Sequence, residues 1–335
     1  MTDESTPLDG VDLVLADLDG VVYRGADAIE HAVASLNAAG VGRAVGYVTN
    51  NASRTPEAVA AQLEGLGLTV RPRDVVTSPQ AAVRLLAALV EPGALVLAVG
   101  GEGLHSELQN AGFRITESAD DSPAAVIQGF SPTLGWAQLA EASYALRPNP
   151  DMPWVATNTD WTFPTARGIA PGNGTLVSAV HSAVGRLPVV AGKPEVAIYE
   201  EAVARFSGTK PLFLGDRLDT DILGANRAGI DSALVLTGID TAKQVLAADA
   251  SSRPTFILDD LRGLQEPYPI TRESTDKDGS RLIEVADSAV RMRENVVTVE
   301  RRGSSAINLL RAGAAAIWGS GLAIYGLEVA PELYA

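Results

Sequence analysis

Short apolar runs alternate with helical patterns along most of the chain. The runs have the length of β-strands, and the stretches between them, such as 56–66, 79–89 and 194–205, are rich in Ala and Leu. Near-continuous apolar strands that alternate with helices are typical of parallel sheets with both faces covered. We therefore expect an α/β fold, with strands at 11–16, 44–49, 94–99, 124–128, 154–157, 212–214 and 232–236.

The pattern changes towards the C-terminus. Residues 266–281 are polar, with two prolines and many charges, and this composition indicates a linker. After it, 282–286 and 296–299 have the pattern of antiparallel strands, and 304–317 has that of a helix. We expect this last part to be a small α+β module.

Two segments bear on the compartment of the protein. Residues 1–10 are polar and acidic, without the basic and apolar regions of a signal peptide. Residues 312–327 carry no charge, but this run is shorter than the ~20 residues that span a bilayer. We expect a buried helix followed by a strand there, with a membrane segment as the alternative, and a cytoplasmic protein.

Composition narrows the functional classes. The 335 residues are 46% hydrophobic and 20% charged, so the chain can bury a large core. Its formal net charge of −15 argues against general affinity for nucleic acid or anionic membranes, so a phosphate site must draw positive charge from a metal or a few Lys and Arg. The absence of Cys excludes disulfides, thiolate nucleophiles and zinc fingers.

Carboxylates follow two of the predicted strands. Asp17 and Asp19 end the first strand, and Asp216, Asp219 and Asp221 follow the strand at 212–214. Ligands bind at the carboxyl ends of strands in open parallel sheets, and buried carboxylates are costly unless a cation or a reaction needs them. Such clusters suit a divalent cation with oxygen ligands. The alternatives are an Asp-Gly turn after the first strand and a solvated acidic turn after the second.

Two weaker signals concern phosphate oxygens. Thr49, Asn50 and Asn51 end another apolar strand, where a hydroxyl and backbone N–H groups can hold phosphate; a helix cap is the alternative. Lys193 lies between a Gly and a Pro that opens a helix, where it can place a positive charge on phosphate. The alternative for this lysine is a solvent-facing loop.

Together these segments resemble the haloacid dehalogenase superfamily of phosphatases, in which DLDG, TNN, GKP and GDRLDTDI recur in this order at strand ends. The roughly 140 residues between Asn51 and Lys193 suit the inserted cap of the 4-nitrophenylphosphatase-like subgroup. The segment ATNTDWTFPTARGIAPGNGTL is similar to that subgroup's cap-to-core region. Its matching residues are Asn158, Asp160, Pro164, Pro171, Gly172 and Gly174.

The resemblance covers about residues 8–265 and implies a doubly wound parallel-sheet core, an inserted α/β cap and a small α+β C-terminal module. It places the core at 8–80 and 188–265, the cap at 81–187 and the module at 282–335. The trailing module makes the chain most similar to the branch that hydrolyses D-glycerol 3-phosphate, whose C-terminal part is reminiscent of an acetyltransferase fold.

By position, the resemblance makes Asp17 the nucleophile that forms an aspartyl-phosphate and Asp19 the general acid and base. It implies Mg²⁺ held by Asp17, the main-chain carbonyl of Asp19 and Asp216. Gly20 and Asp221 would surround this centre, with Asp221 orienting the water around the metal.

Three further groups, Thr49, the Asn50 N–H and Lys193, would neutralise the phosphoryl oxygens in the transition state. In the cap, Arg167 could meet a polar leaving group or only shape a loop. The same two roles are open for the 158–160 segment with Asn158 and Asp160.

We therefore expect a Mg²⁺-dependent phosphatase of a small phosphorylated metabolite, with glycerol 3-phosphate as the leading substrate. Phosphoglycolate or a broad range including 4-nitrophenyl phosphate is the runner-up. A non-catalytic phosphometabolite sensor is the alternative from another class, but a binding site has no use for the Asp17/Asp19 pair. Acetyl transfer by 282–335 is a third reading, opposed by the small size of that segment.

The tail is expected to serve docking or stability. Ile307, Leu310, Ala314, Ile317 and Trp318 recur at helical spacing, so one face of this helix must be buried. The face would pack either on the phosphatase body or on a second copy of the chain in a homodimer.

Overall fold

The computed structural model describes residues 5–165 and 167–334 and divides the chain into two compact units. The first unit comprises Met1–Val45 and Lys210–Ala335, and the second comprises Gly46–Thr209. The boundaries expected for core, cap and C-terminal module rest on the insertion pattern that the resemblance implies, so they stay predictions.

Parallel strands form the centre of the first unit, in the order β15-β14-β13-β1. The residues of β1 are all buried, as its apolar run predicts, and β1 pairs in register with β13 from Leu13↔Pro211 to Ala16↔Leu214. Polar residues following these strands therefore meet at one edge of the sheet. The elements are β1 (Leu13–Ala16), β2 (Tyr23–Arg24), β3 (Asp27–Ala28), α1 (Ala32–Ala39), β13 (Pro211–Gly215), η3 (Leu218–Ile222), α8 (Leu223–Arg227), β14 (Asp231–Val235), α9 (Ala242–Ala247), η4 (Ala250–Ser252), β15 (Phe256–Leu258) and η5 (Leu261–Leu264).

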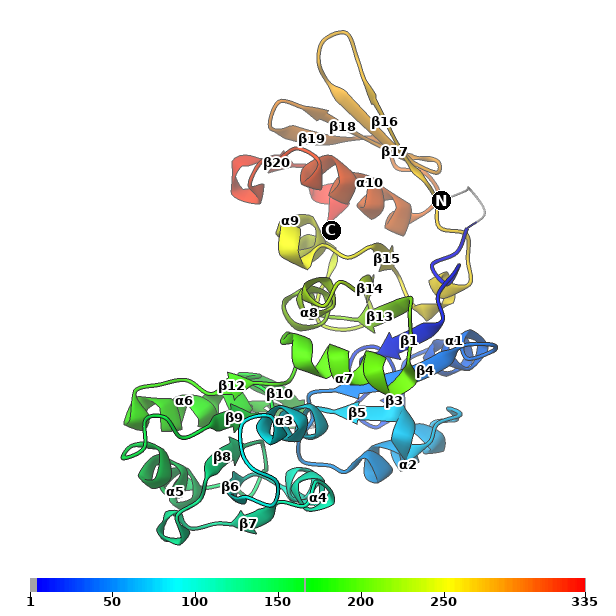
Figure 1. The fold of residues 1–335 in the computed structure, drawn as a ribbon. Helices are drawn as coiled ribbons and strands as arrows, with labels where there is room; N and C mark the ends of the chain where they lie inside the picture. Colours follow the sequence, from blue (N-terminus) through cyan, green and yellow to red (C-terminus); the bar gives the residue numbers. More distant parts are fainter. Residues whose placement is uncertain (1–4, 166, 335) are drawn as a thin grey trace. The chain divides into compact units, whose positions relative to one another are not determined.

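The C-terminal part of the same unit is a mixed sheet in the order β16-β17-β18-β19-β20. Its pairs are antiparallel except β19 with β20, and α10 packs against β17 and β18 (Figure 1). The predicted strands at 282–286 and 296–299 and the helix at 304–317 are all present. The elements are β16 (Thr271–Thr275), β17 (Arg281–Val285), β18 (Ser288–Arg293), β19 (Val296–Arg301), α10 (Ala306–Trp318), η6 (Ile324–Gly326), β20 (Glu328–Val329) and η7 (Pro331–Leu333).

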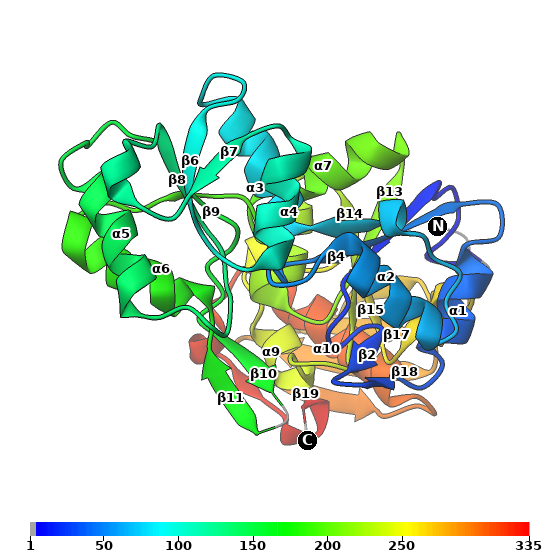
Figure 2. The same cartoon turned by 90° about the horizontal axis from the view of Figure 1, so that it is seen from below.

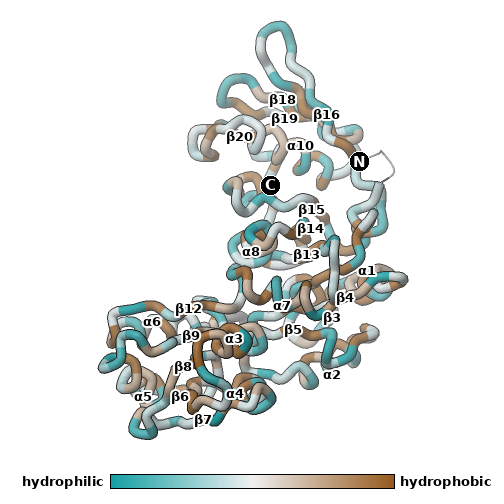
Figure 3. Tube along the Cα trace, in the orientation of Figure 1, coloured by the Kyte–Doolittle hydropathy of each residue, from teal (hydrophilic) through white to brown (hydrophobic). Residues whose placement is uncertain are grey.

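The expectation that 266–281 is only a linker is wrong, because this segment contains β16. All five residues of β16 are exposed, so it has no apolar side chain to bury, and the β16–β17 tip is hydrophilic (Figure 3). The strand is held by its backbone ladder to β17 and by ion pairs across the sheet. Arg281 donates to Glu273 at 2.5 Å, and Arg291 pairs with Asp276.

The apolar face of α10 is buried in the first unit itself. Its side chains share one hydrophobic cluster with strands of the module and with residues of the parallel-sheet body of the same unit. The body contributes Leu218, Ile222, Leu234, Val245, Leu246, Ala248 and Ile257. The tail thus docks on the body of its own chain, which was one of the two expected arrangements.

The membrane alternative for 312–327 is not supported. The helix α10 ends at Trp318 after 13 residues. In the described ranges, no helix combines the length and the apolarity that crossing a bilayer requires.

The second unit contains the parallel pair β4–β5 and a parallel sheet in the order β12-β9-β8-β6-β7. Helices α5 and α6 lie on one side of that sheet, and α3 and α4 lie on the other (Figure 2). The predicted strands and helices of this region are present. The elements are β4 (Ala44–Thr49), α2 (Pro56–Gly65), η1 (Pro72–Asp74), β5 (Val75–Thr77), α3 (Ser78–Ala87), β6 (Leu95–Val99), α4 (Glu102–Asn110), β7 (Arg114–Thr116), η2 (Ala119–Asp121), β8 (Ala125–Gln128), α5 (Trp136–Leu146), β9 (Trp154–Ala156), β10 (Thr162–Thr165), β11 (Gly168–Pro171), α6 (Asn173–Val184), β12 (Val189–Val190) and α7 (Val196–Phe206).

Candidate active site

Three buried carboxylates converge in the first unit. Asp17 follows β1 and is 8% exposed, while Asp216, after β13, and Asp221, in η3, are each 1% exposed. One carboxylate oxygen of each residue lies within 4.8 Å of the others. Three carboxylates this close and this buried would repel one another, so their oxygens fit a divalent cation.

The remaining carboxylates of these two motifs lie elsewhere. Asp19 is exposed and belongs to the turn after β1, in which the Gly20 N–H donates to the Tyr23 carbonyl at 2.9 Å. Asp219 is exposed and pairs with Arg217 at 2.8 Å, so the solvated-turn alternative holds for this residue. An exposed Asp19 can exchange protons with a leaving group or with water.

Asp221 stabilises the turn that follows β13. Its Oδ2 accepts hydrogen bonds from the main-chain N–H groups of Asp216, at 3.1 Å, and Arg217, at 3.2 Å. One of its oxygens is therefore occupied by the protein, which suits a supporting role beside the metal better than direct coordination through both oxygens.

The loop 237–241 after β14 also contacts Asp216, and no sequence motif pointed to it. The Ile239 N–H donates to Asp216 Oδ2 at 2.7 Å. A Cβ atom on Gly238 would lie 1.9 Å from that oxygen, and one on Gly20, whose φ is +82°, would lie 2.3 Å from it. Two glycines thus make room for this carboxylate. The available signal was a Thr-Gly pair directly after a parallel strand.

In the second unit, the side chain of Asn50 joins segments that are distant in sequence. Its Oδ1 accepts from the Lys193 N–H at 2.8 Å, and its Nδ2 donates to the Lys193 carbonyl at 3.0 Å. Lys193 is 4% exposed, so the alternative of a solvent-facing lysine is wrong. A Cβ atom on Gly192 would lie 2.6 Å from Asn50 Oδ1, which explains the glycine before the lysine.

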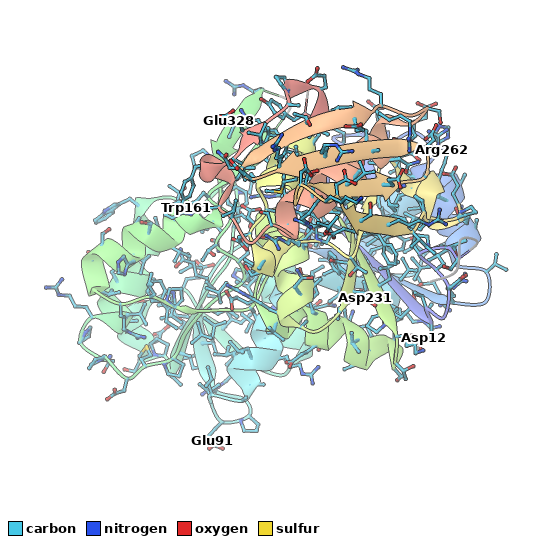
Figure 4. The ribbon with its side chains drawn as sticks, turned by 90° about the horizontal axis from the view of Figure 1, so that it is seen from above. Asp12, Glu91, Trp161, Asp231, Arg262 and Glu328 are labelled. Atoms are coloured by element: carbon cyan, nitrogen blue, oxygen red, sulfur yellow. The ribbon has the colours of Figure 1, made fainter. Side chains whose placement is uncertain are left out.

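The cap candidates Asn158 and Asp160 contact the same asparagine. Asn50 Nδ2 lies 3.1 and 3.2 Å from the two Asp160 carboxylate oxygens, and Asn158 Nδ2 donates to the Asn50 carbonyl at 2.7 Å. These contacts support the loop-shaping role for the pair. Arg167 is exposed in the β10–β11 turn, and Trp161, labelled in Figure 4, is 66% exposed.

Thr49 completes the set in the second unit. It ends β4, is 4% exposed, and its Oγ1 accepts from the Asn51 N–H at 3.1 Å. The structure thus brings Asp17, Asp216 and Asp221 together in the first unit and groups Asn50 with Lys193 in the second.

Buried carboxylates at the carboxyl ends of a parallel sheet fit an enzyme that works with a divalent cation, and comparison with known proteins identifies its family. Residues 14–114 match the haloacid dehalogenase-like hydrolase family model, and residues 190–264 match the related HAD-hydrolase-like model. The chain belongs to the haloacid dehalogenase-like hydrolases and is a phosphatase of that family.

Individual relatives extend this similarity to almost the whole chain. The chain is 43% identical over 318 residues to the D-glycerol 3-phosphate phosphatase of Mycobacterium tuberculosis. The alignment covers 92% of this chain and 86% of the relative. A crystal structure of the glycerol phosphate phosphatase from that organism, in complex with magnesium, has a TM-score of 0.86 at 41% identity and covers 97% and 95% of the two chains. A 4-nitrophenylphosphatase from Thermotoga maritima has a TM-score of 0.72 at 27% identity and covers 78% of this chain and 98% of its own.

These similarities confirm the expected fold class. The parallel sheets are flanked by helices as in the haloacid dehalogenase-like fold, and the mixed sheet β16–β20 is the C-terminal module. The 4-nitrophenylphosphatase matches a smaller share of this chain than the mycobacterial enzyme does.

Proposed function

We propose that this phosphatase is Mg²⁺-dependent and that its substrate is glycerol 3-phosphate. The observation that carries the proposal is the cluster of Asp17, Asp216 and Asp221, whose oxygens form a set that Mg²⁺ prefers. The name of the mycobacterial relative, at 43% identity over most of both chains, supports glycerol 3-phosphate over the wider range of phosphate monoesters.

The site residues divide the reaction between them. When bound, Mg²⁺ would be held by Asp17, the Asp19 main-chain carbonyl and Asp216, and it supplies positive charge beside the phosphate. The Asp17 carboxylate attacks phosphorus while the bond from phosphorus to the glycerol oxygen breaks, and the Asp19 carboxylic acid gives its proton to that oxygen. Asp19 then takes a proton from a water molecule whose oxygen attacks phosphorus, the bond from phosphorus to the Asp17 oxygen breaks, and inorganic phosphate leaves the restored Asp17 carboxylate.

Charge on the phosphoryl oxygens is proposed to be met by Thr49, the Asn50 N–H and Lys193. Lys193 is 4% exposed, so it would place a buried positive charge beside the phosphate in a protein whose net charge is −15. The paired hydrogen bonds between Asn50 and the Lys193 main chain fix the base of this lysine. Arg167 and Trp161 are the exposed cap residues that we propose for contact with the glycerol portion.

The test replaces the nucleophile. Asp17→Asn is nearly isosteric and should keep the fold while lowering kcat by at least about a thousandfold, or ~4 kcal/mol. Phosphate release is measured with Mg²⁺ for glycerol 3-phosphate, phosphoglycolate and 4-nitrophenyl phosphate. A variant that keeps more than about a tenth of wild-type turnover would show that Asp17 is not the nucleophile.

The same panel tests the substrate and the alternative class. A kcat/KM for glycerol 3-phosphate well above those for phosphoglycolate and 4-nitrophenyl phosphate supports the proposed substrate. Similar kcat/KM values for all three esters support a broad-range enzyme. Wild-type protein that binds a phosphate ester without turning it over would be a sensor.

We also propose a cytoplasmic location and retain the homodimer as a prediction. Light scattering of the purified chain measures the oligomeric state.

A further inference from the structure

The loop 237–241 fixes both the side chain and the main chain of Asp216. Besides the hydrogen bond from Ile239 to Asp216 Oδ2, the Asp240 N–H donates to the Asp216 carbonyl at 3.2 Å. Asp240 Oδ2 in turn accepts from the Leu218 N–H at 2.6 Å, and Thr237 Oγ1 donates to the Gly20 carbonyl at 2.7 Å. The position of this loop therefore determines where the Asp216 carboxylate lies.

The loop leads directly into α9, a helix of only six residues. Thr241 and Gln244 form a capping box at its start. A helix this short is unstable alone, so its position depends on the elements against which it packs. Because α9 begins directly after this loop, a shift of α9 would also displace residues 237–241.

The partner of α9 is the C-terminal helix α10. Val245 and Leu246 of α9 are 0% and 2% exposed in the cluster shared with α10. Trp318, the last residue of α10, donates from its indole Nε1 to the Val245 carbonyl at 3.2 Å. The ends of the two helices are thereby joined.

Arg253 reinforces this junction. Its guanidinium lies 5.5 Å from the centroid of the Trp318 ring and donates to the Trp318 carbonyl at 3.2 Å. It also donates from Nε to the Ala248 carbonyl, at the end of α9, at 3.3 Å. One side chain thus contacts both helices, beside the indole that already connects them.

We propose that Trp318 is a positioning residue for the metal site, acting through α9 and the loop 237–241 on Asp216. The inference rests on the proposed function, because it assumes that Asp216 binds Mg²⁺. If α9 shifts, the conformation in which Asp216 faces Asp17 is populated only part of the time, and the apparent affinity for Mg²⁺ falls by that fraction. The C-terminal module would then contribute to catalysis without supplying a group that touches substrate.

The experiment titrates Mg²⁺ into the full chain by calorimetry. Trp318→Phe keeps an aromatic ring but removes the N–H donor, and it should weaken Mg²⁺ binding by about two- to tenfold. At saturating Mg²⁺, kcat should stay within about twofold of wild type, because the reacting groups are unchanged. A general loss of folded protein would lower the amplitude of both measurements and would not produce this split.

The matched control makes the same exchange elsewhere. Trp154 is buried in the second unit, and its indole Nε1 has no hydrogen-bond partner among the described residues. Trp154→Phe should therefore leave the Mg²⁺ dissociation constant unchanged. Arg253→Met is the second variant if Trp318→Phe does not fold, and it should weaken Mg²⁺ binding in the same direction.

Two outcomes separate failure of this inference from failure of the proposed function. If Asp216→Asn abolishes Mg²⁺ binding but Trp318→Phe and Arg253→Met bind Mg²⁺ like wild type, the positioning role is overturned and the metal site stands. If Asp216→Asn binds Mg²⁺ like wild type, the proposed metal site itself is wrong.

Discussion

At the scale of single residues, Asn50 forms hydrogen bonds with several segments of the second unit, which its place in the TNN motif does not reveal. Its side-chain amide forms hydrogen bonds with the main-chain N–H and carbonyl of Lys193 and with the Asp160 carboxylate. Its main-chain carbonyl accepts from Asn158 Nδ2 and from Ser78 Oγ, at 2.7 Å each. A carboxylate could not replace this amide, because it has no N–H to donate. The residue therefore holds the lysine loop and the 158–160 segment together.

Asn50→Asp should destabilise the second unit and lower activity together. The change removes the donor and places a negative charge beside Asp160, and losing one partner of a part-buried hydrogen bond costs about 1–3 kcal/mol. Thermal melting followed by circular dichroism measures the loss. The control is Asn51→Asp, because Asn51 is exposed and accepts the Ser53 N–H through Oδ1, which a carboxylate can also do. Equal melting of the two variants would contradict the bridging role.

The sequence predicted which carboxylates cluster but not the residues that support them. Asp17 and Asp216 were found because each directly follows an apolar strand, and strand ends meet at one edge of a parallel sheet. The Asn50 amide could not be found in this way. Its partners lie 110 and 143 residues away, and only the tertiary structure brings them near. The contact of Ile239 with Asp216 uses a main-chain N–H, which no side-chain pattern reveals.

At the scale of elements, a charged cluster links α3 and α7 in the second unit. Glu201 of α7 accepts from Arg84 of α3 at 2.7 Å and from Arg205 one turn further along α7 at 2.7 Å. Burial raises the pKa of Glu201, but the hydrogen bonds from the two arginines outweigh it, so its pKa is lowered. A carboxyl group whose pKa is lowered by folding stabilises the protein when it is ionised.

Glu201→Gln should therefore reduce stability by about 0.5–1 kcal/mol near neutral pH. The difference from wild type should be fully present above the unfolded Glu pKa of about 4.3 and should vanish as the pH falls through the lower folded value. Urea unfolding at pH 7 and at about pH 3 measures it. Glu200→Gln, an exposed neighbour, is the control. A gap that stays constant between the two pH values would contradict this ionisation effect.

Elements with apolar side chains were predictable, and the polar ones were not. The strand β8 (Ala125–Gln128) is buried throughout and was expected from its apolar run. The strand β16 is exposed throughout, so its sequence carries no alternation of apolar and polar residues. Its register depends on β17 and on arginine pairs across the sheet, which form only after the chain has folded.

At the scale of the whole chain, the C-terminal module is part of the first unit's core. Leu310 and Ile317 of α10 are 4% and 3% exposed in the cluster that includes Val245 and Ile257 of the body. Arg311 also donates twice to the Ile257 carbonyl, at 2.9 and 2.7 Å. The helical spacing in the sequence predicted a buried face, but not which surface would cover it. Shared burial of this kind makes the module and the body unfold together.

Leu310→Ala should consequently weaken elements on both sides of this interface. Removing a buried leucine side chain costs about 2–5 kcal/mol. Native-state hydrogen exchange should then speed up by a similar factor in β17 and β18 of the module and in β14 and β15 of the body, because one cooperative unit has lost that free energy. Tyr325→Ala is the control, since Tyr325 lies in the same module but is 93% exposed, and its exchange should match wild type. Faster exchange confined to β17 and β18 would show that the module opens independently of the phosphatase body.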